Sequence, residues 1–114
     1  MRRSFIAAAV ATSLALAVPA VASAEYGAIA VNPSNGASGV SFNFNKKGPA
    51  LRRAQRKCPG NCRIAVWVRN QCAAVVATQT RFVPGVARTK RKAIRDARRR
   101  ANGPDDLVAW TCSG

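Results

Sequence analysis

The sequence predicts an α+β domain: two ββαβ repeats that form a mainly antiparallel sheet, with two basic helices on one side and disulfides that staple the domain. Three observations predict this class. The chain contains an internal repeat, each copy changes from strand-like to helical periodicity, and the four cysteines follow an export-type N-terminus. With 114 residues, the chain has room for one small domain behind a leader.

The repeat is clearest between ALRRAQRKCPGNCRIAVW and the later segment AIRDARRRANGPDDLVAW, which align without a gap. Their identical positions include Trp67 and Trp110. Upstream, YGAIAV matches CAAVVA, and the Gly-Val pair at Gly39 matches the one at Gly85. The second copy is three residues shorter just before its helix. Each copy is therefore predicted to be a supersecondary unit of the same kind.

The N-terminus has the parts of a secretory signal peptide. Arg2 and Arg3 supply positive charge, an apolar run follows, and a small-x-small pattern ends at Ala24. We expect cleavage near Ala24 and a secreted or envelope location. The expected divisions of the chain are residues 1–24 for the signal peptide, 25–114 for a single domain, about 26–71 for repeat one and about 72–112 for repeat two.

Each repeat opens with a short apolar segment that predicts a strand, residues 28–31 in repeat one and 73–77 in repeat two. In repeat one the segment NPSNG follows, and its proline, asparagine and glycine are typical of a tight turn. In repeat two the next strand, FVPGV, contains Pro84. Because proline has no N–H to donate to a neighbouring strand, Pro84 predicts an edge position.

The second strand of repeat one, VSFNF, alternates apolar and polar side chains. We expect Val40, Phe42 and Phe44 on a buried face, and Ser41 and Asn43 on a solvent-exposed face. Each repeat closes with an uninterrupted apolar segment, IAVWV or LVAW. These closing segments predict strands that are buried on both faces, with their tryptophans in the core.

A helix is predicted before the last strand of each repeat. Pro49 suits the first helical residue in repeat one, and Thr89 is the expected N-cap in repeat two. Small or apolar residues recur at helical spacing on one face of each helix. They are Ala50, Leu51, Ala54 and Cys58 in repeat one, and Ala93, Ile94, Ala97 and Ala101 in repeat two. Such faces would let both helices lie close to the sheet.

The other faces of the predicted helices are strongly basic. The chain has 19 Lys and Arg against four Asp and Glu; without Arg2 and Arg3, seventeen against four leave a net charge of +13. The candidate anion-binding residues are Arg52, Arg53, Arg56, Lys57, Lys90, Arg91, Lys92, Arg95, Arg98, Arg99 and Arg100. This clustering favours non-specific, salt-sensitive binding of anionic polymers or a membrane surface, and a merely solvated helix face is the alternative.

The four cysteines are interpreted as forming structural disulfide bonds. Cys58 and Cys62 both lack a counterpart in repeat two, as expected for a pair that bridges to itself. This favours Cys58–Cys62 together with Cys72–Cys112 among the three connectivities that four cysteines allow. A redox site usually has two residues between its cysteines and lies at a helix N-terminus, and a zinc site needs converging reduced thiolates. We therefore expect no metal.

Four segments of the chain together resemble a known family: YGAIAV, the bracketed turn CPGNC, VWVRNQC and the terminal VAWTC. The family is the secreted bacterial one catalogued as domain of unknown function 4189. The resemblance covers nearly all of the predicted mature chain. It implies a secreted, cysteine-stapled domain without an established catalytic role. The sequence departs from the family's pattern in repeat two, where Ala101 and Asp105 stand in place of a cysteine pair.

The usual components of a catalytic site are missing from the sequence. The chain has no histidine, and Asp105 and Asp106 are adjacent in a predicted turn. NPSNGASG lacks a phosphate-binding lysine. We predict a non-enzymatic domain without a cofactor or a small-molecule substrate. The alternatives are a structural envelope protein, an inhibitor or immunity-type protein with a protein partner, and a hydrolase with an unusual site; the sequence does not indicate the oligomeric state.

Overall fold

The computed structural model describes residues 24–114, so the expected signal peptide lies, except for its last residue, outside the described residues. Each repeat is a ββαβ unit, as predicted. Repeat one comprises β1 (Tyr26–Val31), β2 (Ser38–Phe44), α2 (Lys47–Lys57) and β3 (Arg63–Arg69). Repeat two comprises β4 (Cys72–Ala77), β5 (Phe82–Ala87), α3 (Lys90–Ala101) and β6 (Asp106–Cys112). The α+β class is thereby confirmed.

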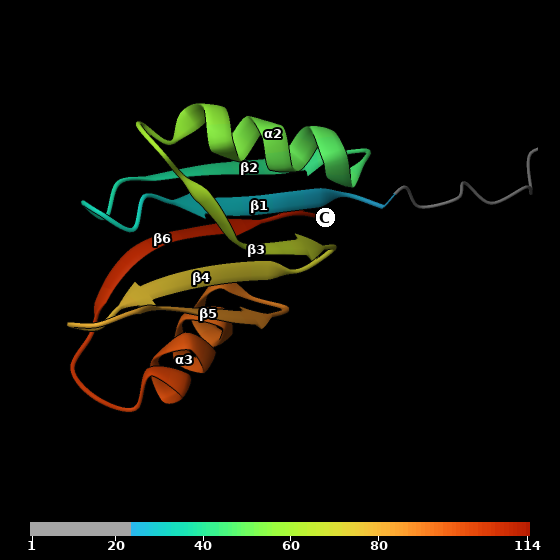
Figure 1. The fold of residues 1–114 in the computed structure, drawn as a ribbon. Helices are drawn as coiled ribbons and strands as arrows, with labels where there is room; N and C mark the ends of the chain where they lie inside the picture. The colour runs from blue at the N-terminus through green and yellow to red at the C-terminus, as the bar shows by residue number, and fades with distance from the viewer. Residues whose placement is uncertain (1–23) are drawn as a thin grey trace, which may run out of the picture.

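Each repeat forms its own three-stranded antiparallel sheet, in the order β2-β1-β3 for repeat one and β5-β4-β6 for repeat two. Pro84 lies in the edge strand β5, as predicted. The two sheets pack face to face, and α2 and α3 cover their opposite outer faces (Figure 1). This corrects the expectation of one sheet with both helices on one side. Because the central strands β1 and β4 are apolar on both faces, each sheet needs two covers: its own helix and the other sheet.

The core accordingly has three apolar layers. The layer between the sheets contains Ile29, Val31, Val68, Ala73 and Val75. A second layer, between α2 and its sheet, contains Ala28, Ala30, Ala54 and Cys58. The third, between α3 and its sheet, contains Cys72, Ala74, Val76, Val83, Ala93, Ala97 and Ala101. Alternate residues of β1 and of β4 thus contribute to two layers, as the period of a strand requires.

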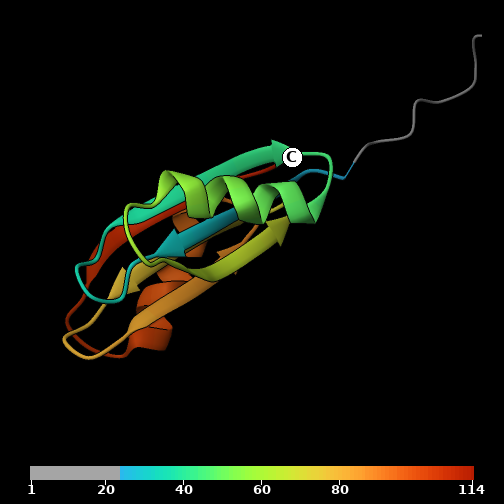
Figure 2. The same cartoon turned by 45° about the horizontal axis from the view of Figure 1, so that its top comes forward.

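Each helix lies directly on a glycine of the second strand of its repeat. A Cβ atom at Gly39 would collide with the backbone carbonyl oxygen of Ala54, and one at Gly85 would collide with the backbone nitrogen of Ala97. Figure 2 shows the closeness of α2 to β1 and β2. The small residues on the helix faces and these two glycines therefore set the distance between helix and sheet.

This close packing also explains why β2 departs from its predicted pattern at Ser41 and Phe42, although Asn43 is exposed as predicted. Ser41 is buried, and its hydroxyl donates to the carbonyl oxygen of Ala50 at 2.7 Å. Phe42 is 58% exposed, whereas Val40 packs at the edge of the layer between the sheets. Because only small side chains fit beneath α2, Gly39 and Ser41 face the helix, and the larger apolar residues face away from it.

The helix starts agree with the sequence in repeat two and differ slightly in repeat one. The hydroxyl of Thr89 accepts a hydrogen bond from the backbone nitrogen of Lys92 at 3.2 Å, so Thr89 is the N-cap that was expected. Helix α2 begins at Lys47 rather than at Pro49. Pro49 still lies in the first turn, where a backbone N–H would have no acceptor within the helix.

Candidate anion-binding surfaces

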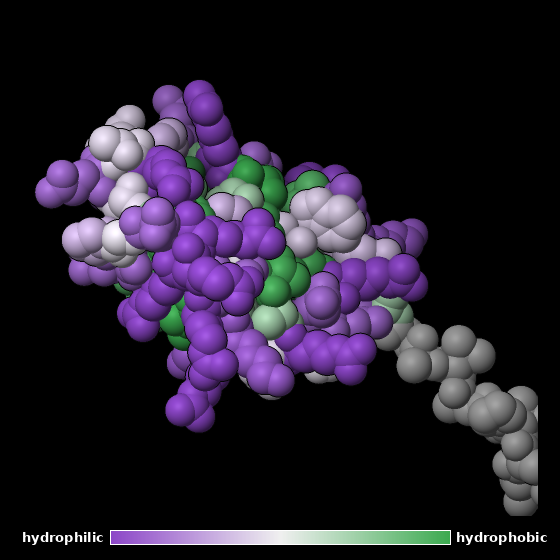
Figure 3. All heavy atoms as spheres, turned by 90° about the horizontal axis from the view of Figure 1, so that it is seen from below, coloured by the Kyte–Doolittle hydropathy of each residue, from purple (hydrophilic) through white to green (hydrophobic). Residues whose placement is uncertain are grey.

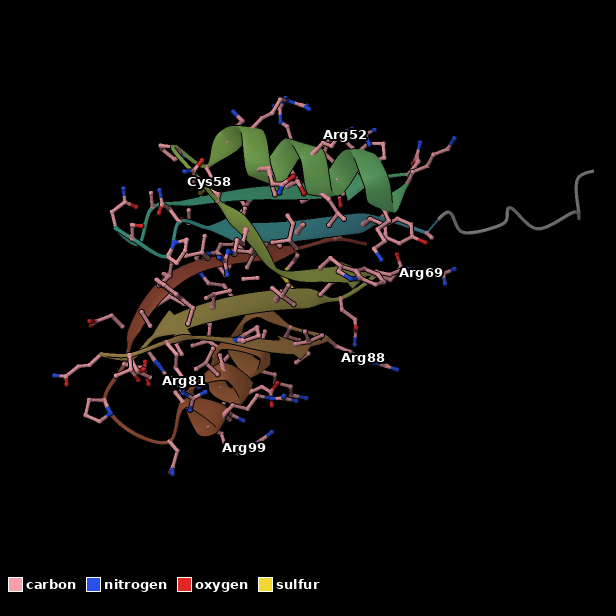
Figure 4. All side chains as sticks on the ribbon, viewed as in Figure 1. Arg52, Cys58, Arg69, Arg81, Arg88 and Arg99 are labelled. Carbon is pink, nitrogen blue, oxygen red and sulfur yellow. A yellow bond between two sulfur atoms is a disulfide. The ribbon has the colours of Figure 1, made fainter. Side chains whose placement is uncertain are left out.

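The structure places the basic candidate residues on two surfaces rather than one. We call the exposed residues Arg52, Arg53, Arg56 and Lys57 the α2 face. We call the exposed residues Lys90, Arg91, Lys92, Arg95, Arg98, Arg99 and Arg100 the α3 face. Figure 3 looks onto the α3 side of the molecule, where hydrophilic side chains crowd the surface, and Figure 4 shows Arg52 and Arg99 on opposite sides. The two faces cannot contact one flat surface together.

The α3 face is partly neutralised by acidic side chains of its own repeat. Asp96 forms ion pairs with Arg99 at 2.6 Å and with Arg100 at 3.1 Å. Asp105 forms an ion pair with Arg98 at 3.2 Å. Within residues 24–114 no ion pair involves α2, and every charged residue of that helix is basic. The α2 face is therefore the less compensated of the two.

Asp96 is a buried carboxylate that the sequence analysis did not single out. Its Oδ2 accepts a hydrogen bond from the backbone nitrogen of Val86, in the edge strand β5, at 3.1 Å. Burial by itself would raise the pKa of Asp96, but the Val86 N–H and the charges of Arg100 and Arg99 outweigh it and hold the pKa below its usual value. The side chain is therefore ionised at neutral pH and links α3 to the edge of its sheet.

This pKa predicts a specific loss of stability in acid. A carboxyl group whose pKa is lower in the folded protein than in the unfolded chain, about 3.9 for Asp, stabilises the fold above that pH. The contribution is lost as the pH falls through the folded-state pKa. Asp96→Asn is expected to cost about 1–2 kcal/mol at pH 7 and to make the stability less dependent on pH below about 4. Urea denaturation at a series of pH values measures both effects.

The matched control is Asp106→Asn, because Asp106 is exposed and takes part in none of the ion pairs found among the described residues. It should leave both the stability at pH 7 and the acid dependence close to those of the unmodified protein. An Asp96→Asn profile parallel to that of the unmodified protein at every pH would contradict the assignment.

Each repeat pairs a lysine with an exposed tryptophan. The Nζ atom of Lys47 lies 4.0 Å from the ring centroid of Trp67, and that of Lys90 lies 4.0 Å from the ring centroid of Trp110. The tryptophans are 43% and 42% exposed, so the expectation of strands buried on both faces is wrong for β3 and β6. Both strands are sheet edges, and a lysine of the covering helix takes the place of a core partner. The repeat alignment contained this signal, since both lysines and both tryptophans are aligned.

One further basic residue is structural rather than free to bind. The guanidinium of Arg81 donates to the carbonyl oxygens of Arg100 and Ala101 at 3.3 and 3.4 Å. These carbonyls lie at the C-terminal end of α3, where the helix dipole favours a cation. Arg81 therefore binds the C-terminal end of α3 from outside the helix, and we do not count it in the α3 face.

The cysteines form the two predicted bridges, Cys58–Cys62 and Cys72–Cys112. Residues 24–114 contain no free cysteine and no group of three or more acidic or cysteine side chains that could hold a metal ion. Two disulfides in so short a chain are typical of a protein in an extracellular or periplasmic compartment. None of the helices in the described part of the chain is long and apolar enough to cross a membrane.

Comparisons with known proteins give a family and one structural relative. No curated protein matches the chain significantly. Among solved structures, the chain is similar to Rv1813c from Mycobacterium tuberculosis, determined by NMR, with 32% sequence identity and a TM-score of 0.63. The match covers 83% of this chain and 80% of Rv1813c. Residues 26–112, which include both repeats and both disulfides, match the family described as Domain of unknown function (DUF4189), and the chain therefore belongs to that family.

Proposed function

We propose that the protein is a secreted, non-enzymatic domain that binds anionic polymers or anionic membrane surfaces through its α2 and α3 faces. The observation that carries this proposal is the α2 face: its charges are all basic and exposed, and they have no acidic partner within residues 24–114. Like charges along one helix repel each other and reduce its stability. An external anion would remove that repulsion, so binding and helix stability would increase together.

The position of the two faces suggests how the protein would engage its ligand. Because α2 and α3 cover opposite outer faces of the stacked sheets, one molecule presents basic side chains in two opposite directions. A long polyanion or two membrane patches could occupy both faces at once, and the linked sites would raise the overall affinity. The lysines over Trp67 and Trp110 shield one face of each ring, which argues against base stacking as the main interaction.

The test is retention of the protein on immobilised heparin, on DNA and on anionic vesicles across a salt series. Arg52→Gln with Arg56→Gln reduces the α2 face, and Arg91→Gln with Arg95→Gln reduces the α3 face; none of these residues is in an ion pair found in the described chain. Each pair of substitutions should lower the salt concentration needed for elution. On DNA, each lost phosphate contact should reduce the slope of log affinity against log salt by about 0.9.

The matched control is Arg63→Gln with Arg69→Gln, which removes the same charge from exposed positions at the two ends of β3. It should reduce retention less than either helix pair. If the control has the same effect as the helix pairs, binding follows net charge alone and the two faces have no special role. Weak retention of the unmodified protein at low salt would contradict the proposal as a whole.

A further inference from the structure

The edge strands β2 and β5 occupy equivalent positions in the two repeats, but only β5 is protected. Pro84 lacks an N–H, and the N–H of Val86 donates to the carboxylate of Asp96 at 3.1 Å. Residues two apart in a strand point their backbone groups to the same side, so both devices act on the outer edge of β5. Proteins commonly close exposed sheet edges in these ways, because a free edge pairs with other chains.

Repeat one lacks both devices. Counted from the central strands, in which Ala28 pairs with Ser41 and the aligned Ala74 pairs with Gly85, Val40 stands where Pro84 stands in β5 and Phe42 stands where Val86 stands. In the helix alignment, Arg53 stands where Asp96 stands in α3. The outer edge of β2 therefore has backbone N–H groups at Val40 and Phe42 that correspond to the closed positions of β5, with no proline and no carboxylate of repeat one to close them.

The partners of the missing carboxylate are nevertheless present in repeat one. Arg99 and Arg100 bind Asp96 in repeat two, and Arg56 and Lys57 occupy the aligned positions of α2. A groove of about 590 Å³ runs along this edge, lined by residues 38–42, Phe44, Arg53 and Lys57. Phe42, 58% exposed, adds an apolar surface to the groove. Repeat one thus has a strand edge and cations that could bind a carboxylate. It lacks the carboxylate itself, because Arg53 stands at the position aligned with Asp96.

We propose that the edge of β2 binds an extended acidic segment of a partner protein as an added strand. An Asp or Glu carboxylate of that segment would take the place that Asp96 fills in repeat two, between the Phe42 N–H and the cations of α2. Backbone pairing along the edge would supply affinity, and the carboxylate would fix the register. A second copy of this chain is a poor occupant, because the chain carries a large net positive charge and few acidic residues.

This inference shares cations with the α2 face, but it can be tested separately from the proposed function because it also requires a free strand edge. A labelled peptide that alternates Thr and Val around a central Glu serves as the probe, and its affinity for the full mature protein is measured by fluorescence polarisation. The same peptide with Gln in place of Glu should bind about tenfold more weakly or worse, since a charge-assisted hydrogen bond to a carboxylate is lost. Equal binding of the two peptides would overturn the proposal.

Two variants close the edge of β2 from within the protein, one with a carboxylate and one with a proline. Arg53→Asp supplies the missing carboxylate from within and should weaken peptide binding by about tenfold or more. Arg52→Asp, on the same helix but outside the groove, makes the same charge change and should have a clearly smaller effect. Ser38→Pro removes one N–H from the edge without changing any charge, and it should also weaken binding. If Arg53→Asp and Arg52→Asp weaken binding equally, the interaction is electrostatic only and the proposed site is wrong.

A chemical variant of the probe covers the case in which Ser38→Pro impairs folding. A peptide methylated on alternate backbone nitrogens, in the two possible phases, keeps its charge but loses the N–H groups of one edge. One phase should bind like the unmethylated peptide and the other should not bind measurably. Equal binding of both phases would exclude strand addition. Sedimentation of the protein alone gives a further check: dimers that disappear with Ser38→Pro would assign the edge to a second copy instead and would overturn the proposal.

Discussion

Replacing Cys72 and Cys112 with alanine is expected to lower the free energy of unfolding by about 4 kcal/mol. The same change at Cys58 and Cys62 is expected to cost only about 2 kcal/mol. The two bridges span sequence separations of 40 and 4, and in the chain-entropy account a bridge constrains the unfolded chain more when it closes the longer loop. The domain is small and its core is rich in alanine, so the larger loss is a substantial fraction of its total stability.

The position of each bridge supports the same ranking. Cys72 and Cys112 are direct partners in the pairing of β4 with β6, and both pack in the layer beneath α3. Cys58 and Cys62 close the turn between α2 and β3, and repeat two makes the corresponding turn without a bridge. Urea denaturation of the two double variants measures the difference. A larger loss for the Cys58 and Cys62 variant would show that the short bridge does more than close a turn.

The internal repeat explains how much of the fold could be predicted from the sequence. Aligning the two copies gave the order of elements in both, and the joint absence of two cysteines from repeat two gave the pairing of all four. Pro84 identified an edge strand, because its missing N–H is a local property that no tertiary contact can restore. The order of elements, the disulfide pairing and the edge position of β5 were therefore predicted correctly.

The stacking of two sheets could not be predicted in the same way. An apolar run such as YGAIAV shows that both faces of a strand are covered, but it does not show whether a helix or a second sheet covers each one. The wrong predictions for Ser41 and Phe42 in β2 have a related cause. Alternation separated the two faces of β2 correctly, but the close approach of α2 at Gly39 buries the small Ser41, which the alternation alone does not show.

The candidate site, too, was predicted only in part. The basic residues are exposed, as expected from their charge, but their separation onto opposite sides of the molecule follows from the two-sheet arrangement. The role of Asp96 depends on its hydrogen bond to Val86 at the edge of β5, and the residue pattern of the sequence gives no sign of that contact. The unprotected edge of β2 becomes visible only when that contact is compared with Arg53 in repeat one.

Gly85→Ala and Gly39→Ala are expected to destabilise the protein strongly, each by about 3 kcal/mol. At Gly85 the added methyl group would meet backbone atoms of Ala93 and Ala97, and at Gly39 it would meet the backbone of α2 around Ala54. Backbone atoms in a helix cannot move aside individually as a flexible side chain can. The whole helix would have to shift away from its sheet, and the alanine layer beneath it would lose its contacts.

Gly103→Ala is the matched control, because no heavy atom lies within 4 Å of a Cβ built at that position. Its effect should stay within about 0.5 kcal/mol, as for other surface substitutions. Thermal and urea denaturation of the three variants give the comparison. If the alanine variants at Gly39 and Gly85 were as stable as Gly103→Ala, the helices would have to be able to move outward at little cost. The close packing would then not be what holds α2 and α3 against their sheets. Hydrogen bonds between helix and strand, such as the one that Asp96 accepts from Val86, would have to account for it instead.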